Sequence, residues 1–349
     1  MSEVHHAAVA GFDFEPEHLR AFLEAEMPEL RGPMRAERIG GGQSNPTYFI
    51  SFDNREMVLR KRPPGELPKS AHDVAREYRL IRALFPTRVP VPEPILFRDS
   101  PEVVGTPFYL MGRVHGRIFH DASAPSLTPE QRRELYRAYA RALAQLHALD
   151  WRALGLEAFA RPGSFLTRQV DRWGRAFGEG DPKVERIVGW LRDNLPASER
   201  LTLVHGDFKF NNLVFHPDRP ELVGVLDWEL ATIGDPMTDL ATNWAFLWET
   251  APQEYGGIRG LDLDHLGIPD AETYFEDYYA ASGASDRVQT FHKVLALLRN
   301  AGIFRGIGER HAAGIAAAAD AADAAKLEQV FVARALTLIE TSAMVCEAG

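Results

Sequence analysis

The feature that most constrains the fold is a change of sequence pattern near residue 116. Before it, short apolar runs alternate with Gly, Pro and Asp-Asn turns, a pattern typical of strands. We expect strands near 35–39, 47–52, 57–62, 95–98 and 108–114, and helices near 15–26 and 70–85. After it, apolar residues recur at helical spacing. The sequence therefore predicts an α+β fold, with a β-rich N-terminal lobe (1–115) and a helical C-terminal lobe (116–349).

The helical part carries clear start signals. Thr128 is a good N-cap and Pro129 fits the first helical position, so a helix is predicted over 128–149. Asp235 and Pro236 give the same signal for a later helix. The expected C-terminal helices lie near 163–178, 181–194, 236–249, 270–281, 285–302 and, in an alanine-rich stretch, 312–341.

Composition excludes several classes of protein. With 39 basic and 49 acidic residues the net charge is −10, which disfavours nucleic acid as a partner. A single cysteine, Cys346, allows no disulfide within the chain, which suits a reducing cytoplasm. No apolar run reaches 18 residues and the N-terminus lacks the features of a secretory signal. We expect a cytoplasmic protein that does not span a membrane.

Two segments carry the chemistry. Residues 204–212 read VHGDFKFNN, and residues 225–229 read VLDWE. They place Asp207, then Asn212 five residues later, then Asp227 at the end of an apolar strand. Phosphoryl transfer from ATP needs a carboxylate that orients the attacking hydroxyl and oxygen ligands that hold Mg²⁺. The spacing fits the kinase catalytic loop and the later metal aspartate.

On these residues the chain resembles the aminoglycoside phosphotransferase and choline kinase-like family of small-molecule kinases. Within it, the chain is similar to the kinase-like domain fused to some acyl-CoA dehydrogenases. The resemblance covers nearly the whole chain, with its motifs in the family's order. It implies a protein-kinase-like, two-lobe fold with ATP in the cleft.

The resemblance also implies roles for the motif residues. Asp207 would orient the substrate hydroxyl, and Lys209 would neutralise charge on the γ-phosphate. Asn212 and Asp227 would bind Mg²⁺; the five-residue offset selects Asn212 over its neighbour Asn211. Two further residues have open or supporting roles: Glu229, a metal contact or a surface residue, and Asp239, expected to brace the catalytic loop.

The N-terminal motifs point to nucleotide binding. The segment 40–45, GGGQSN, lies between the first two expected strands, where backbone N–H groups can cover phosphates. Arg60 stands where kinases carry a lysine and would hold the α- and β-phosphates, paired with Glu77. Strand alternation puts Lys61 on the opposite face from Arg60. The full set of predicted nucleotide contacts is Gly41, Gly42, Ser44, Asn45, Val58, Arg60, Glu77, Met111 and Val114, the last two at the hinge.

Two departures from the protein-kinase pattern favour a small-molecule kinase over a protein kinase. Gly206 replaces the arginine that would read an activation-loop phosphate, and Trp228-Glu229 replaces Phe-Gly. We therefore expect an ATP- and Mg²⁺-dependent O-phosphotransferase that acts on the hydroxyl of a small molecule. A non-catalytic nucleotide-binding pseudokinase is the alternative, because Arg60 and Gly112 are unusual at their positions.

The sequence leaves the acceptor open. The resemblance favours a hydroxy acid or a hydroxyacyl-CoA, with an aminoglycoside or an amino alcohol as the alternative. Arg299 and Arg305 are candidates for binding an anionic group, beside Gly302 and Gly306, which would let a ligand approach the backbone.

Overall fold

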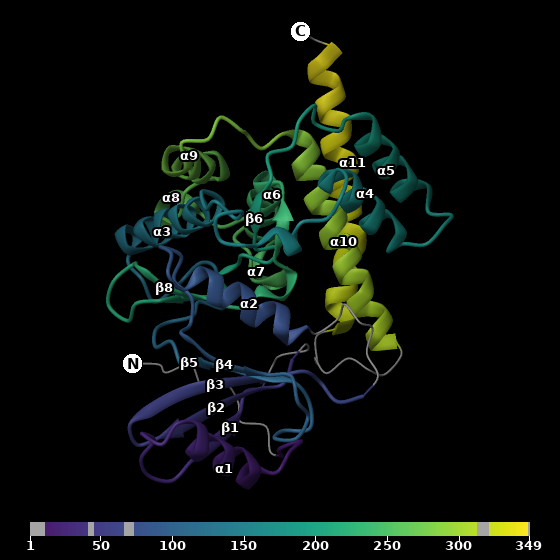
Figure 1. Ribbon diagram of the computed structural model, residues 1–349. Helices are drawn as coiled ribbons and strands as arrows, with labels where there is room; N and C mark the ends of the chain where they lie inside the picture. Colours follow the sequence, from purple (N-terminus) through teal and green to yellow (C-terminus); the bar gives the residue numbers. More distant parts are fainter. Residues whose placement is uncertain (1–10, 41–44, 66–72, 313–320, 348–349) are drawn as a thin grey trace. The chain divides into compact units, whose positions relative to one another are not determined.

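The computed structural model describes residues 11–40, 45–65, 73–312 and 321–347 (Figure 1). The chain forms two compact units. One comprises Met1–Ile118 together with Asn212–Leu230, and the other comprises Phe119–Asn211 together with Ala231–Gly349. The segment 212–230 thus belongs to the same unit as the N-terminal sheet.

The first unit is built on a five-stranded antiparallel sheet. Its strand order is β1-β2-β3-β5-β4. The strands are β1 (Arg35–Arg38), β2 (Thr47–Phe52), β3 (Arg55–Lys61), β4 (Pro94–Arg98) and β5 (Phe108–Gly112). All five lie within two residues of the strands predicted from the sequence. In the central pair, Val58 of β3 faces Met111 of β5.

Two helices cover opposite faces of this sheet (Figure 1). Helix α1 (Pro16–Glu26) packs Leu19 and Leu23 onto one face, against residues such as Leu59 and Leu110. Helix α2 (Val74–Leu84) covers the other face, where the Tyr78 ring lies 5.9 Å from the ring of Tyr109. Because side chains alternate along a strand, β3 sends Arg60 toward α2 and Lys61 toward the α1 side.

A late hairpin completes the first unit. Strands β7 (Leu213–Phe215) and β8 (Leu222–Val225) pair antiparallel and are followed by the short helix η3 (Trp228–Leu230). Phe215 and Arg117 exchange two backbone hydrogen bonds of 2.8 and 2.7 Å, and the Val225 N–H donates to the Pro90 carbonyl at 2.8 Å. These bonds fix the hairpin to the N-terminal part of the chain.

The second unit is mostly helical. Its helices are α3 (Pro129–His147), α4 (Phe165–Arg175), α5 (Pro182–Asp193), α6 (Pro236–Leu247), α7 (Pro252–Tyr255), α8 (Leu263–Leu266), α9 (Ala271–Ser282), α10 (Thr290–Ala312) and α11 (Ala321–Glu347). Strands β6 (Thr202–Val204) and β9 (Thr232–Gly234) form a small antiparallel pair, and η1 (Glu157–Phe159) and η2 (Phe210–Asn212) are single 3₁₀ turns. None of the helices in the described ranges is long and apolar enough to cross a membrane.

The predicted caps are confirmed. Thr128 forms a capping box with Gln131 at the start of α3, and the Asp235 side chain accepts the Met237 N–H at 2.8 Å at the start of α6. The predicted bounds of the 285–302 helix are wrong at both ends, and helix α10 begins only at Thr290. Helix α10 continues to Ala312, through Gly302, because this glycine packs against the Trp173 ring of α4. The tertiary contact outweighs the weak helix propensity of glycine.

Candidate active site

In the first unit, Arg60 lies among three carboxylates. Its Nε is 3.0 Å from Glu77 Oε2, and its Nη2 is 2.8 Å from Asp227 Oδ1 and 3.5 Å from Glu229 Oε2. The predicted pair between Arg60 and Glu77 is therefore confirmed. Glu229, whose role the sequence left open, lies in the same cluster. Lys61 pairs instead with Asp13, at 3.0 Å, on the other face of the sheet, as predicted.

Glu77 is held by two further side chains. Only 2% of it is exposed, and its carboxylate accepts from Asn45 Nδ2 at 2.7 Å and from the Tyr109 hydroxyl at 3.1 Å. Burial raises the pKa of Glu77 to about 7; Arg60 opposes this shift, and Asp227 and Glu229 add to it. For Arg60, burial favours a lower pKa, but the surrounding carboxylates outweigh it and raise its pKa. The guanidinium is charged throughout the physiological range.

The β7–β8 hairpin brings the two predicted metal ligands together. Leu213 pairs with Val225 in the ladder, and the Leu226 N–H donates to the Asn212 carbonyl at 2.8 Å. Asn212 directly precedes the first strand, and Asp227 follows the second. Both residues therefore lie at the same end of the hairpin.

Asp227 has an unusual backbone. Its φ is +62°, in the left-handed region that non-glycine residues rarely adopt. Aspartate is among the few residues that tolerate it, at a cost of about 1–3 kcal/mol. Such strain is common where a side chain must point in a functionally required direction.

The group fits a hard divalent cation. Asp227, Glu229 and Asn212 carry oxygen donors of the type that Mg²⁺ prefers. The cluster sets three carboxylates against one guanidinium, so it has an excess of negative charge when ionised. Within the described ranges, no group of three or more His, Cys, Asp or Glu side chains has the arrangement of a metal site by itself. The predicted site would instead use Asn212 and the phosphates of a nucleotide as additional ligands.

The other predicted nucleotide contacts are only partly described. Gly41, Gly42 and Ser44 lie outside the described residues. Asn45 is buried, and its Oδ1 has no hydrogen-bond partner among the described residues.

The predicted hinge follows β5. Val58 and Met111 lie opposite each other in the sheet and are nearly buried. The Gly112 and Arg113 N–H groups already bond the carbonyls of Glu93 and Glu56. Within the described ranges, no backbone hydrogen bond uses the Val114 N–H.

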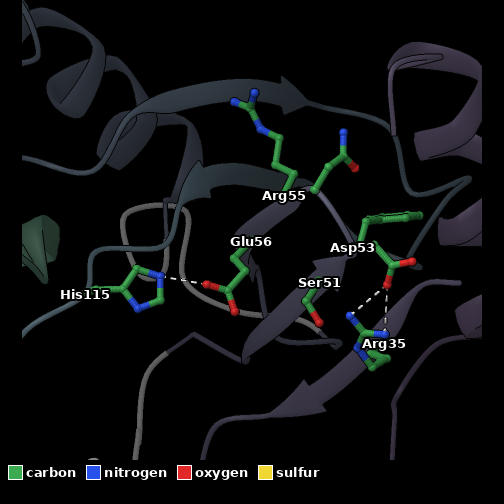
Figure 2. A pocket seen from close by; sticks show the side chains of 8 residues that line it. Arg35, Ser51, Asp53, Arg55, Glu56 and His115 are labelled. Atoms are coloured by element: carbon green, nitrogen blue, oxygen red, sulfur yellow. Dashed lines mark hydrogen bonds and ion pairs between the residues drawn. The ribbon is translucent and has the colours of Figure 1, made fainter. Parts of the chain in front are cut away.

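An open, polar hollow in the first unit contains none of the predicted site residues (Figure 2). It is lined by Arg35, Ser51, Phe52, Asp53, Asn54, Arg55, Glu56 and His115. Its arginines pair with carboxylates, Arg35 with Asp53 at 3.3 Å and Arg55 with Glu93 at 3.0 Å, and His115 Nε2 lies 2.7 Å from Glu56. The hollow is therefore separate from the predicted nucleotide site at Arg60 and Asp227.

In the second unit, Asp207 follows β6 and pairs with Lys209, whose Nζ lies 3.1 Å from Asp207 Oδ2. Burial would raise the pKa of Asp207, but the charges of Lys209 and Arg299 hold it below its ordinary value. The carboxylate is therefore ionised at neutral pH and can accept a hydrogen bond from a hydroxyl.

The loop that carries Asp207 is braced by Asp239 of α6. Asp239 accepts the His205 N–H at 2.7 Å and the Gly206 N–H at 2.9 Å, which confirms the predicted bracing. His147 Nε2 lies 3.3 Å from Asp239, and His147 Nδ1 lies 2.8 Å from the Tyr278 hydroxyl. Because a carboxylate only accepts, Nε2 carries the proton and Nδ1 accepts from Tyr278. Burial lowers the pKa of His147, so this imidazole is neutral at pH 7.

The two candidate anion-binding arginines have different partners in the structure. Arg299 donates to the Gly206 carbonyl, directly before Asp207. Arg305 pairs with Glu309 at 3.0 Å and with Glu328 at 3.2 Å. The prediction that Gly302 leaves room for a ligand is wrong, because the Trp173 ring occupies that space. Tyr109, His147 and Tyr278 were not predicted as site residues, since no local pattern connects them to the motifs.

Sequence comparison agrees with these features. Residues 35–270 match the phosphotransferase enzyme family. The mouse protein named acyl-CoA dehydrogenase family member 10 is 39% identical over 304 residues, which is 85% of this chain. The match spans 28% of that relative's length.

Structural comparison identifies the fold. A Ralstonia eutropha protein assigned to the aminoglycoside phosphotransferases superposes with a TM-score of 0.84 at 33% identity, over 94% of this chain and 99% of that one. Choline kinase from Cryptosporidium parvum superposes with a TM-score of 0.61 at 13% identity, over 94% and 96% of the two chains. The predicted protein-kinase-like fold is confirmed. The chain therefore belongs to the phosphotransferase enzyme family, which also confirms the predicted class of enzyme.

Proposed function

We propose that this protein uses ATP and Mg²⁺ to phosphorylate a hydroxyl group of a small molecule. The observation that carries the proposal is the cluster in which Arg60 contacts both Glu77 and the strained Asp227. A structural ion pair does not need a backbone in the left-handed region or a third carboxylate. A site that holds phosphates through a cation and a metal through a carboxylate needs both kinds of group.

The proposed role of each residue follows from its charge. Arg60, fixed by Glu77, would bind phosphate oxygens of the nucleotide. Asn212 and Asp227 would hold Mg²⁺, which when bound neutralises charge on the transferred phosphoryl group. Asp207 would accept the hydrogen bond of the acceptor hydroxyl and orient it. Because Lys209 and Arg299 lower the pKa of Asp207, this carboxylate is a weak base, which suits a loose transition state with late proton transfer.

For the acceptor, we propose a hydroxy acid or a hydroxyacyl-CoA. The support is the similarity to proteins named as acyl-CoA dehydrogenase family members. The second candidate is an aminoglycoside or an amino alcohol, and the similarity to the Ralstonia eutropha protein supports the aminoglycoside. The third is a pseudokinase that binds nucleotide without transferring phosphate.

One screen separates the three candidates. The full chain is incubated with radiolabelled ATP and Mg²⁺, and with hydroxy acids, hydroxyacyl-CoAs, amino alcohols or aminoglycosides in parallel, with EDTA as the metal control. Label in a hydroxy acid or hydroxyacyl product supports the first acceptor class, and label in an aminoglycoside or an amino alcohol supports the second. Mg²⁺–ATP stabilisation without any labelled product supports the pseudokinase. Neither stabilisation nor transfer would contradict all three.

A further inference from the structure

The residue before Asp207 is held at both of its polar groups. Gly206 has a φ of +80°, a conformation that favours glycine. Its N–H donates to Asp239 Oδ1 at 2.9 Å, and its carbonyl accepts from Arg299 Nη2. Asp239 of α6 and Arg299 of α10 thus fix Gly206 from two different helices. The backbone orientation of Gly206 in turn determines the direction in which the Asp207 side chain points.

Arg299 is itself fixed by its surroundings. Its guanidinium lies 5.8 Å from the centre of the Trp173 ring. Gly302, three residues later on the same helix, makes room for that ring, since a Cβ there would lie 3.0 Å from Trp173 Cε3. Arg299 therefore reaches the Gly206 carbonyl from helix α10, with the Trp173 ring beside its guanidinium.

This arrangement is more than a packing contact. Arg299 Nη1 is buried and has no hydrogen-bond partner among the described residues. A buried charge that is only partly hydrogen-bonded destabilises a fold. Together with Lys209, the charge also favours the ionised form of Asp207.

We propose that Arg299 is a positioning residue for Asp207, which fixes the catalytic loop through the Gly206 carbonyl. Gly206 occupies the position at which protein kinases carry an arginine, so helix α10 supplies a cation to this loop from 93 residues further along the chain. The kinetic consequence of this inference rests on the proposed function; the structural consequence does not.

Arg305 is a matched control. It lies six residues further along α10, and its side chain is 33% exposed. It contacts Glu309 and Glu328. Replacing it removes an arginine and two ion pairs from the same helix without touching the loop.

The first measurement is hydrogen exchange, followed by mass spectrometry, on the full chain without ligands. We expect Arg299→Gln to speed exchange of the amides in the 202–212 peptide by about tenfold, because the loop opens more readily. Arg299→Lys, which keeps the charge, should fall between Arg299→Gln and the wild type, and Arg305→Gln should leave this peptide unchanged. Equal exchange in all variants, or an equal rise in the Arg299 and Arg305 variants, would overturn the inference.

The second measurement is kinetic. Arg299→Gln should lower kcat on the order of 10- to 100-fold, with KM for ATP nearly unchanged, because the loss is one of orientation. The acid limb of the pH–kcat profile should move to higher pH, and Arg299→Lys should restore part of kcat. A wild type without phosphotransfer would contradict the proposed function alone, since hydrogen exchange still tests the role of Arg299.

Discussion

Arg60 Nη2 lies 2.8 Å from Asp227 Oδ1, although the two residues are 167 positions apart in the sequence. The residue predicted to bind phosphate is therefore also the counter-ion of the residue predicted to bind Mg²⁺. The same guanidinium neutralises the buried Glu77. Arg60 thus connects the stability of the first unit to its proposed chemistry.

Removal of the Arg60 guanidinium should lower the free energy of unfolding. Arg60→Met keeps much of the side-chain volume but leaves Glu77 buried without its ion pair, so we expect a loss of about 3–5 kcal/mol in the free energy of unfolding. Urea titration measures it. The control is Arg35→Met, which breaks an exposed pair with Asp53 and should cost at most about 1 kcal/mol. Equal losses in the two variants would show that the Arg60 cluster does not stabilise the fold specifically.

Substitution of Asp207 and substitution of Asp227 should affect catalysis and nucleotide binding differently. Asp207→Asn is expected to lower turnover by roughly 10²- to 10⁴-fold, because the amide cannot accept the hydroxyl proton. It should leave the rise in Tm caused by Mg²⁺–ATP intact. Asp227→Asn should reduce both turnover and that rise. The roles assigned here would be wrong if Asp207→Asn kept near-wild-type turnover, or if Asp227→Asn kept full nucleotide stabilisation.

The N-cap of α6 should give stability a pH dependence. Burial raises the pKa of Asp235 from 3.8 to about 7, supported by Asp286 and Glu199 and opposed by the Met237 N–H and Arg200. The folded state therefore holds this proton more tightly than the unfolded chain does. The contribution of Asp235 to the free energy of unfolding falls as pH rises from about 4 to about 7.

Asp235→Asn keeps a capping oxygen and removes this titration. We expect the variant to be more stable than the wild type at pH 8, on the order of 2–4 kcal/mol, and to lose the advantage near pH 4. The control is Asp270→Asn at the N-cap of α9, where hydrogen bonds with Thr273 lower the aspartate pKa. That variant should instead be less stable than the wild type at pH 8. Urea titrations at several pH values test both, and a shared sign at pH 8 would contradict the assignment.

Two glycines of α10 should respond oppositely to alanine. A Cβ at Gly306 would meet only the flexible end of Arg310, at 3.4 Å, so Gly306→Ala should stabilise the helix by about 0.5–1 kcal/mol. A Cβ at Gly302 would press on the Trp173 ring at 3.0 Å, and Gly302→Ala should be neutral or destabilising. Thermal unfolding of the two variants compares them, and a gain in Gly302→Ala as large as in Gly306→Ala would refute the packing argument.

Local signals in the sequence predicted the fold well. Thr128 and Asp235 are helix caps in the structure, because capping depends on residues within one turn. The pair of Arg60 and Glu77 also followed from the resemblance. The three-residue strands β6, β7 and β9 were missed, since they are too short to show alternation, although the apolar strand ending at Leu226 was predicted where β8 lies.

Long-range contacts escaped prediction for a different reason. The bond from Arg299 to the Gly206 carbonyl and the contacts of His147 with Asp239 and Tyr278 join segments that are 92 to 131 residues apart. No spacing within a single element encodes such contacts. The sequence suggested Arg299 and Arg305 equally, and only the packing of α10 distinguishes them.

The β7–β8 hairpin has a consequence for how the protein is made. Its bonds to Pro90 and Arg117 belong to the first unit, yet the hairpin is translated about one hundred residues after that sheet. On the ribosome, the N-terminal sheet stays incomplete while helices α3, α4 and α5 emerge. A chain released at Ile118 would lack the segment that carries Asp227, and no fragment cut at a single peptide bond can contain the whole first unit without residues 119–211 of the second.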